Sequence, residues 1–167
     1  MQNSDMDERI ILNKNLCEKY PFLVPRNRFS GEVVDDYDYS YTELDAMPDG
    51  WRKAFGEKIC EEIKNELNKL PEDIRKNYHI IQIKEKYGYL CWYDNWHTEE
   101  MRNVLNKYER LSERTCIKCG AAATKISDGW ISPYCDSCAS LLNIKSFIPI
   151  DKYLEGAYED EDEEISI

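Results

Sequence analysis

Cys116-Ile-Lys-Cys119 and Cys135-Asp-Ser-Cys138 are the two stretches that decide the fold of the C-terminal part of this 167-residue chain. Each C-x-x-C turn can direct two thiolates at one point, and two such turns complete the four-thiolate tetrahedral shell that zinc prefers. The fifteen residues between the pairs fall within the spacing typical of zinc sites. Because protein sulfur fills all four positions, none is left for a catalytic water. The pattern predicts one structural Zn²⁺.

Redox dithiols and disulfides are the competing interpretations of these cysteines. Residues 1–9 are polar and acidic rather than signal-like, and no apolar run approaches the ~20 residues of a membrane span. We therefore expect a cytoplasmic protein with no membrane partner. In such a reducing compartment, paired cysteines favour metal binding over disulfides.

The flanks of the cysteine pairs predict the shape of a finger over residues 115–145. Gly120 supplies the open backbone conformation that a tight zinc knuckle needs. Asp128-Gly129 is a strong hairpin-turn signal between two β-favouring stretches. After Cys138 the sequence is helical in character, which places the second pair at a helix N-terminus that favours thiolate charge. Knuckle, hairpin and helix predict a treble-clef-like finger, with a zinc ribbon as the near alternative.

Residues 1–114 predict an α+β body. Apolar residues at helical spacing indicate helices near 8–19, 50–70 and 98–111, and Thr98 is the predicted N-cap of the last one. Two β-rich runs around Tyr87-Gly88 predict a hairpin near 79–93. Strict alternation would turn Ile81 and Ile83 toward one face of this hairpin. The expected fold class is thus α+β, with the finger C-terminal to the body.

The net charge of −11 is concentrated near the C-terminus. Residues 146–167 carry eight Asp or Glu and one Lys, and Glu159–Glu164 is a run of six acids. Such runs repel internally and favour a solvated, mobile end. We expect an acidic tail over 146–167 that either keeps the protein soluble, binds a basic partner or mimics nucleic acid.

A long aromatic segment between Pro21 and Gly50 is the best candidate partner surface outside the finger. It contains Tyr37, Tyr39 and Tyr41 among several aspartates, and long irregular loops are commonly functional. Aromatic side chains give large contact areas, so these tyrosines and Trp96 are the predicted anchors. The alternative is that they simply cover the core.

Nucleic-acid binding needs concentrated positive charge. The finger is nearly neutral, but a patch including Arg26 and Arg28 could form, and neighbouring aromatics could stack on bases. DNA or RNA binding therefore stays open as the second function. An HNH-like nuclease is a third, which would need histidine beside the finger; His79 and His97 are remote from it in sequence. We expect no enzymatic activity, since no nucleotide-loop or hydrolase motif occurs.

Several strings resemble a group of small, uncharacterised four-cysteine zinc-finger proteins encoded by phages and mobile elements of gut bacteria. They are Pro25–Arg28, Tyr37–Leu44, Gly50–Gly56, Gln82–Gly88 and the finger with Gly129–Ile131. The resemblance implies a zinc site and a bacterial host cytoplasm, and it lends no activity. Together with the charge, it favours a non-enzymatic protein that engages a host protein with a basic surface, such as a nucleic-acid-binding defence enzyme, as inhibitor or adaptor.

Overall fold

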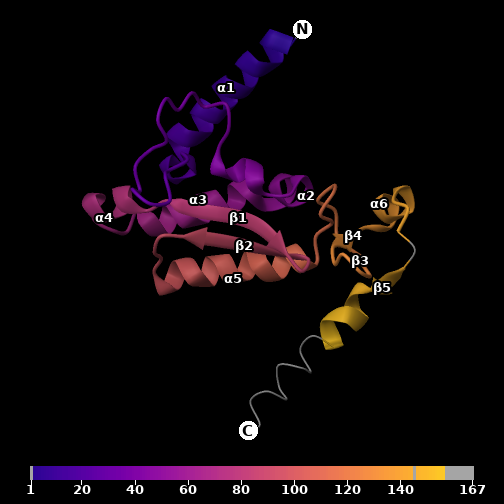
Figure 1. Cartoon of the computed structure of the whole chain (residues 1–167). Helices are drawn as coiled ribbons and strands as arrows, with labels where there is room; N and C mark the ends of the chain where they lie inside the picture. Colours follow the sequence, from indigo (N-terminus) through magenta and orange to yellow (C-terminus); the bar gives the residue numbers. More distant parts are fainter. Residues whose placement is uncertain (1, 145, 157–167) are drawn as a thin grey trace.

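The computed structural model describes residues 2–144 and 146–156 as a helix-and-hairpin body joined to a small C-terminal finger (Figure 1). The α+β class predicted from the sequence is confirmed. Among the described residues no helix is long and apolar enough to cross a membrane.

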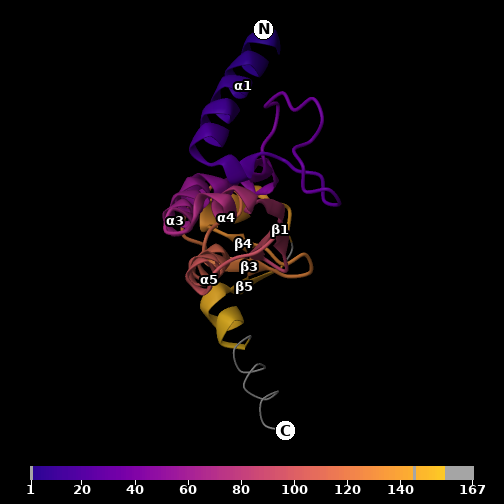
Figure 2. The same cartoon turned by 90° about the vertical axis from the view of Figure 1, so that its left-hand side faces the viewer.

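The N-terminal helix α1 (Gln2–Lys19) ends where predicted and begins earlier. Its first half extends away from the body, on the side opposite to residues 150–156 (Figure 1). A short 3-10 turn, η1 (Pro21–Leu23), follows, and a second, η2 (Glu43–Ala46), precedes the central helix. The loop between these turns lies beside α1, as Figure 2 shows.

The central helical segment runs from Asp49 to Leu67 in three connected pieces. These are α2 (Asp49–Trp51), the π-helical η3 (Arg52–Gly56) and α3 (Glu57–Leu67). The apolar stripe that predicts this helix consists of Phe55, Ile59, Ile63, Leu67 and Leu70; the first four are buried, whereas Leu70 lies beyond α3 and is partly buried. A further helix, α4 (Glu72–Asn77), was not predicted; its single large apolar residue, Ile74, is 44 % exposed and gives no stripe.

The hairpin pairs β1 (Ile80–Lys86) with β2 (Tyr89–Asp94), and α5 (Glu99–Glu113) packs against β2. Tyr87 and Gly88 both have positive φ, as the tight turn requires. The expectation that Ile81 and Ile83 lie on the same face of the hairpin is wrong. A bulge between Ile80 and Gln82 shifts the register, so Ile80 and Ile83 face the core while Ile81 is 38 % exposed.

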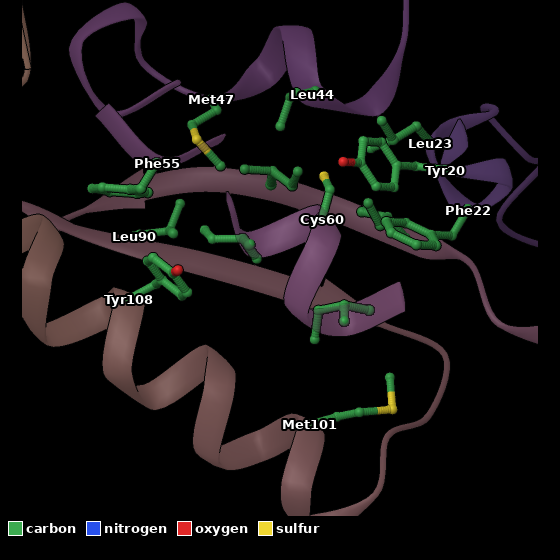
Figure 3. Close-up of a cluster of buried hydrophobic side chains, with 14 of the residues drawn as sticks. Tyr20, Phe22, Leu23, Leu44, Met47, Phe55, Cys60, Leu90, Met101 and Tyr108 are labelled. Atoms are coloured by element: carbon green, nitrogen blue, oxygen red, sulfur yellow. The ribbon is translucent and has the colours of Figure 1, made fainter. Parts of the chain in front are cut away.

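The core lies between the hairpin, α3, α5 and the two 3-10 turns (Figure 3). Its largest fully buried side chains include Trp51, Tyr20, Tyr78 and Phe55. Both of these tyrosines keep a partner for the hydroxyl: Tyr20 donates to Glu61 and Tyr78 donates to Asp94. Phenol rings therefore fill the core without leaving a buried polar group unpaired.

The finger contains β3 (Lys125–Ser127), β4 (Pro133–Tyr134) and α6 (Asp136–Leu141). The boundary expected at residue 146 is wrong. Strand β5 (Phe147–Pro149) pairs with β3, and residues 150–156 are helical, with Ile150 and Leu154 buried against Ile126. The apolar run from Phe147 to Ile150 explains this, because it completes the small sheet of the finger. The acidic run Glu159–Glu164 lies outside the described residues.

Candidate metal centre

The four cysteine sulfurs converge on one point. The Sγ atoms of Cys116, Cys119, Cys135 and Cys138 all lie within 4.8 Å of one another. The Sγ atoms of Cys119 and Cys135 are 3.6 Å apart, close to the roughly 3.8 Å expected of two sulfurs bound to one tetrahedral ion. A disulfide would need about 2.05 Å, and all four cysteines are free. The arrangement fits a metal site and not a pair of disulfides.

Backbone N–H groups donate hydrogen bonds to these sulfurs and so stabilise their thiolate forms. Burial raises the pKa of the Cys116 thiol, but hydrogen bonds from the backbone amides of Cys135, Cys119 and Lys118 outweigh it and lower the pKa to about 7. The backbone N–H of Cys138 donates to the Sγ of Cys135 over 3.4 Å, at the N-terminus of α6.

The four thiols cannot all ionise without a cation between them. The hydrogen bond with the Cys135 thiol, followed by burial, raises the pKa of Cys138 to about 12. Hydrogen bonding within the cluster therefore lowers the pKa of one thiol and raises the pKa of another. A bound divalent cation removes that conflict by stabilising every thiolate, so metal uptake would release protons.

The local folds of the two pairs differ, as the sequence predicts. The first pair lies on a knuckle in which the backbone N–H of Gly120, at positive φ, donates to the oxygen of Cys116 over 3.0 Å. The second pair opens α6, with Cys135 at the N-cap position. Knuckle, hairpin and ligand-bearing helix follow one another in treble-clef order, and the zinc-ribbon alternative, with the second pair on a hairpin, is wrong.

The start of the central helical segment, which belongs to the body, contacts the knuckle around Cys116 to Gly120. The backbone N–H of Gly50 donates to the oxygen of Ile117 over 2.9 Å. A side chain at Gly50 would have its Cβ 2.2 Å from the Cys116 oxygen, and one at Gly120 would have its Cβ 2.6 Å from the Gly50 oxygen. Only two glycines facing each other allow these backbones to approach so closely.

Trp51 completes this attachment. Its indole Nε1–H donates to the backbone oxygen of Thr115 over 2.9 Å, and the ring is fully buried. These supporting residues were missed as part of the site. Gly50-Trp51 does stand out in the sequence as a glycine beside a tryptophan, but nothing local to it indicates contact with residues 115–117.

The tyrosines of the aromatic segment form a cluster against α1. The Tyr37 ring lies 4.8 Å from that of Tyr39 and 5.9 Å from that of Tyr41. The Tyr37 hydroxyl donates to the Tyr41 backbone oxygen and also contacts the thiol of Cys17. Tyr39 packs against the core, whereas Tyr41 is 43 % exposed.

The other predicted contact residues lie elsewhere. Trp96 packs edge-on to Tyr78 and is partly buried. The Arg26 guanidinium donates to the backbone oxygens of Gly31 and Lys76, so much of its hydrogen-bonding capacity is used within the fold. Arg28 is exposed. The structure thus brings the three tyrosines together but does not gather all six predicted residues at one site.

Both histidines belong to the open end of the hairpin. His79 directly precedes β1, and the Nδ1 atom of His97 lies 2.8 Å from the Asp94 carboxylate at the end of β2. The turn at Gly88 lies at the other end, where it approaches Ile131 of the finger. A seven-residue strand spans roughly 23 Å, so the hairpin separates the histidines from the finger tip.

Three comparisons with known proteins found no match to this chain. No protein-family model, no curated protein sequence and no solved structure matches it.

Proposed function

We propose that this protein is a non-enzymatic zinc-binding protein of phage or mobile-element origin. It acts by binding a host protein with a basic surface, as an inhibitor or adaptor. The observation that carries the first part is the closed four-cysteine cluster, which a glycine-glycine contact and Trp51 attach to the body. Four thiolates select zinc among the common divalent ions, and a full protein shell gives the ion a structural role.

Charge supports a basic partner. Asp35, Asp36 and Asp38 are exposed on the segment that carries the tyrosine cluster. Hydrogen bonds from the Ser40 side chain and backbone lower the pKa of Asp38 and so favour its carboxylate form further. Exposed acids on the same segment as an exposed tyrosine suit a cationic surface, and the net charge of −11 steers such a partner toward the protein.

DNA or RNA binding is the second candidate, and the cations that would serve it are largely engaged. Lys125 of the finger pairs with Asp136 over 3.2 Å. Arg52 pairs with Asp45, and Arg114 lies 3.3 Å from the Asp151 carboxylate. The exposed cations Arg28, Lys53, Arg110 and Lys118 remain, and they come from four different segments of the chain rather than from one basic run.

The test is affinity capture from the bacterial host lysate with the zinc-loaded full chain, with and without nuclease treatment. We expect to capture a basic protein in stoichiometric amount, and nuclease treatment should not remove it. Its binding should weaken with rising salt and should be lost with the triple variant Asp35→Asn, Asp36→Asn, Asp38→Asn. The matched control variant neutralises three exposed acids of α1 (Asp5→Asn, Asp7→Asn, Glu8→Gln), and it should still bind the partner. If the captured partners disappear on nuclease treatment, the result would instead support DNA or RNA binding as the function.

A further inference from the structure

A cavity of about 560 Å³ opens at the end of the body remote from the finger. Residues from the C-terminal end of α1, from η1, from the end of α3 and from α4 line it; Figure 1 shows where α1, α3 and α4 lie. This volume is within the range of small-molecule sites in proteins. The apolar part of its wall comes from Pro21, Phe22, Leu67 and Tyr78.

The charged part of the wall has the opposite sign to the rest of the molecule. Five cations line the cavity against two acids, Glu18 and Glu72, in a chain with 22 Lys or Arg and 33 Asp or Glu. The five cations are Lys19, Arg26, Lys64, Arg75 and Lys76. Like charges gathered in a concave, partly apolar site focus a local positive potential even on an acidic protein.

Most of this positive charge is not neutralised by neighbours. Lys76 pairs with Glu72 over 3.0 Å, and Arg75 acts on the same carboxyl from further away, where it helps to lower the pKa of Glu72. Within the described ranges, no carboxylate lies at ion-pair distance from Lys19, Lys64 or Arg75. The ammonium groups of Lys19 and Lys64 instead lie 5.2 and 5.6 Å from the centroid of the Tyr20 ring, whose hydroxyl donates to Glu61. Such a contact holds an ammonium group only weakly and leaves its positive charge available to a ligand.

Arg26 adds an independent observation. Its two terminal nitrogens donate to the backbone oxygens of Gly31 and Lys76, which fixes the guanidinium in place. Its Nε atom is buried and, among all side-chain nitrogens and oxygens of the described residues, is the one buried atom without a hydrogen-bond partner. A buried donor without an acceptor is costly, and on this cavity-lining residue a water, an ion or a ligand would satisfy it.

We propose that this cavity binds a small organic phosphate of nucleotide size. Lys19, Lys64 and Arg75 contact its phosphate oxygens, and the Pro21 and Leu67 side of the wall contacts its organic part. Arg and Lys are the side chains that recognise phosphate oxygens, through forked and point-charge contacts respectively. The site is separate from the metal cluster and from the tyrosine cluster, so it is independent of the proposed protein-binding role.

Isothermal titration calorimetry on the full zinc-loaded chain, with ATP, tripolyphosphate and adenosine as probes, tests this proposal. We expect ATP to bind more tightly than tripolyphosphate, adenosine not to bind, and the affinity for ATP to fall with added salt. The variant Lys64→Gln with Arg75→Gln should weaken ATP binding by about tenfold or more.

The matched control, Lys58→Gln with Arg110→Gln, removes the same charge from exposed positions outside the cavity and should keep the ATP affinity within about twofold. Thermal melts establish that both double variants are folded. Absence of ATP binding, or an equal loss in the two double variants, overturns the proposal. Adenosine binding as tight as ATP overturns the phosphate contacts, and equal affinity for tripolyphosphate overturns the contact with the apolar wall.

Discussion

Cys135 connects the two halves of the metal cluster, since its sulfur lies 3.6 Å from Cys119 and accepts the Cys138 amide. Replacing it by serine in Cys135→Ser exchanges a soft thiolate for a hydroxyl that zinc binds poorly. We expect bound zinc, measured by elemental analysis of purified protein, to fall from one ion per chain to a small fraction.

Cys91→Ser is the matched control for this change. Cys91 lies on β2, outside the cluster, and is only half-buried. Its replacement should leave the zinc content at one ion per chain. If Cys135→Ser also retains a full equivalent of zinc, the four-cysteine assignment is contradicted.

Gly50 tests the contact between body and finger. The methyl group of Gly50→Ala would collide with the backbone of Cys116 and Ile117, which cannot rotate away as a side chain does. We expect a loss of about 1–3 kcal/mol or more in the free energy of unfolding, by analogy with overpacked cores. Urea denaturation of the zinc-loaded protein measures it.

Gly156→Ala provides the comparison. No heavy atom lies within 4 Å of a Cβ at Gly156, and the residue is helical, so alanine should be neutral or slightly stabilising. An equal effect of the two substitutions would show that the close approach at Gly50 contributes nothing.

Among the helices, α5 has the clearest start signal. The Thr98 hydroxyl accepts the backbone N–H of Met101 over 3.2 Å, and Glu99 and Glu100 occupy the first turn. Thr98→Ala should therefore lower the free energy of unfolding by about 1 kcal/mol, measured by thermal or urea denaturation.

The conservative variant Thr98→Ser keeps the accepting hydroxyl and should lose much less stability. Equal losses for alanine and serine would assign the effect to the methyl group of Thr98 rather than to the cap.

Elements with local signals were the ones predictable from the sequence. Thr98, the turn at Tyr87-Gly88 and the spacing of the cysteines each specify a conformation within a few residues. The bulge that turns Ile81 outward and the apolar run that extends the sheet of the finger beyond residue 146 depend on partners distant in sequence. The same holds for the site: its four ligands were predictable, but its attachment through Gly50 was not.

At the scale of the whole molecule, body and finger are in direct contact, so loss of the metal should change the stability of the neighbouring part of the body. Treatment with a chelator should speed hydrogen exchange at the Gly50 amide, which is bonded to Ile117. Because metal binding is coupled to folding, we expect this loss to be cooperative with unfolding of the finger. The measurement is exchange followed by NMR or mass spectrometry.

The Leu23 amide, bonded to Tyr20 on the far side of the core, serves as an internal reference and should change much less. Identical acceleration at both amides would mean that the chain unfolds as one unit when the metal leaves. No acceleration at Gly50 would mean that the interface does not need the metal.

The bond from Trp51 to Thr115 joins residues 64 positions apart, and this has a consequence during synthesis. At about 5 to 20 residues per second, a ribosome needs roughly 4 to 17 s to proceed from Trp51 to Cys138, the last of the four ligands. Throughout that interval Trp51, the largest side chain of the core, lacks the folded finger that it contacts in the native protein. The nascent chain should therefore be a client of ribosome-associated chaperones, and zinc supply in the cell should limit the yield of native protein.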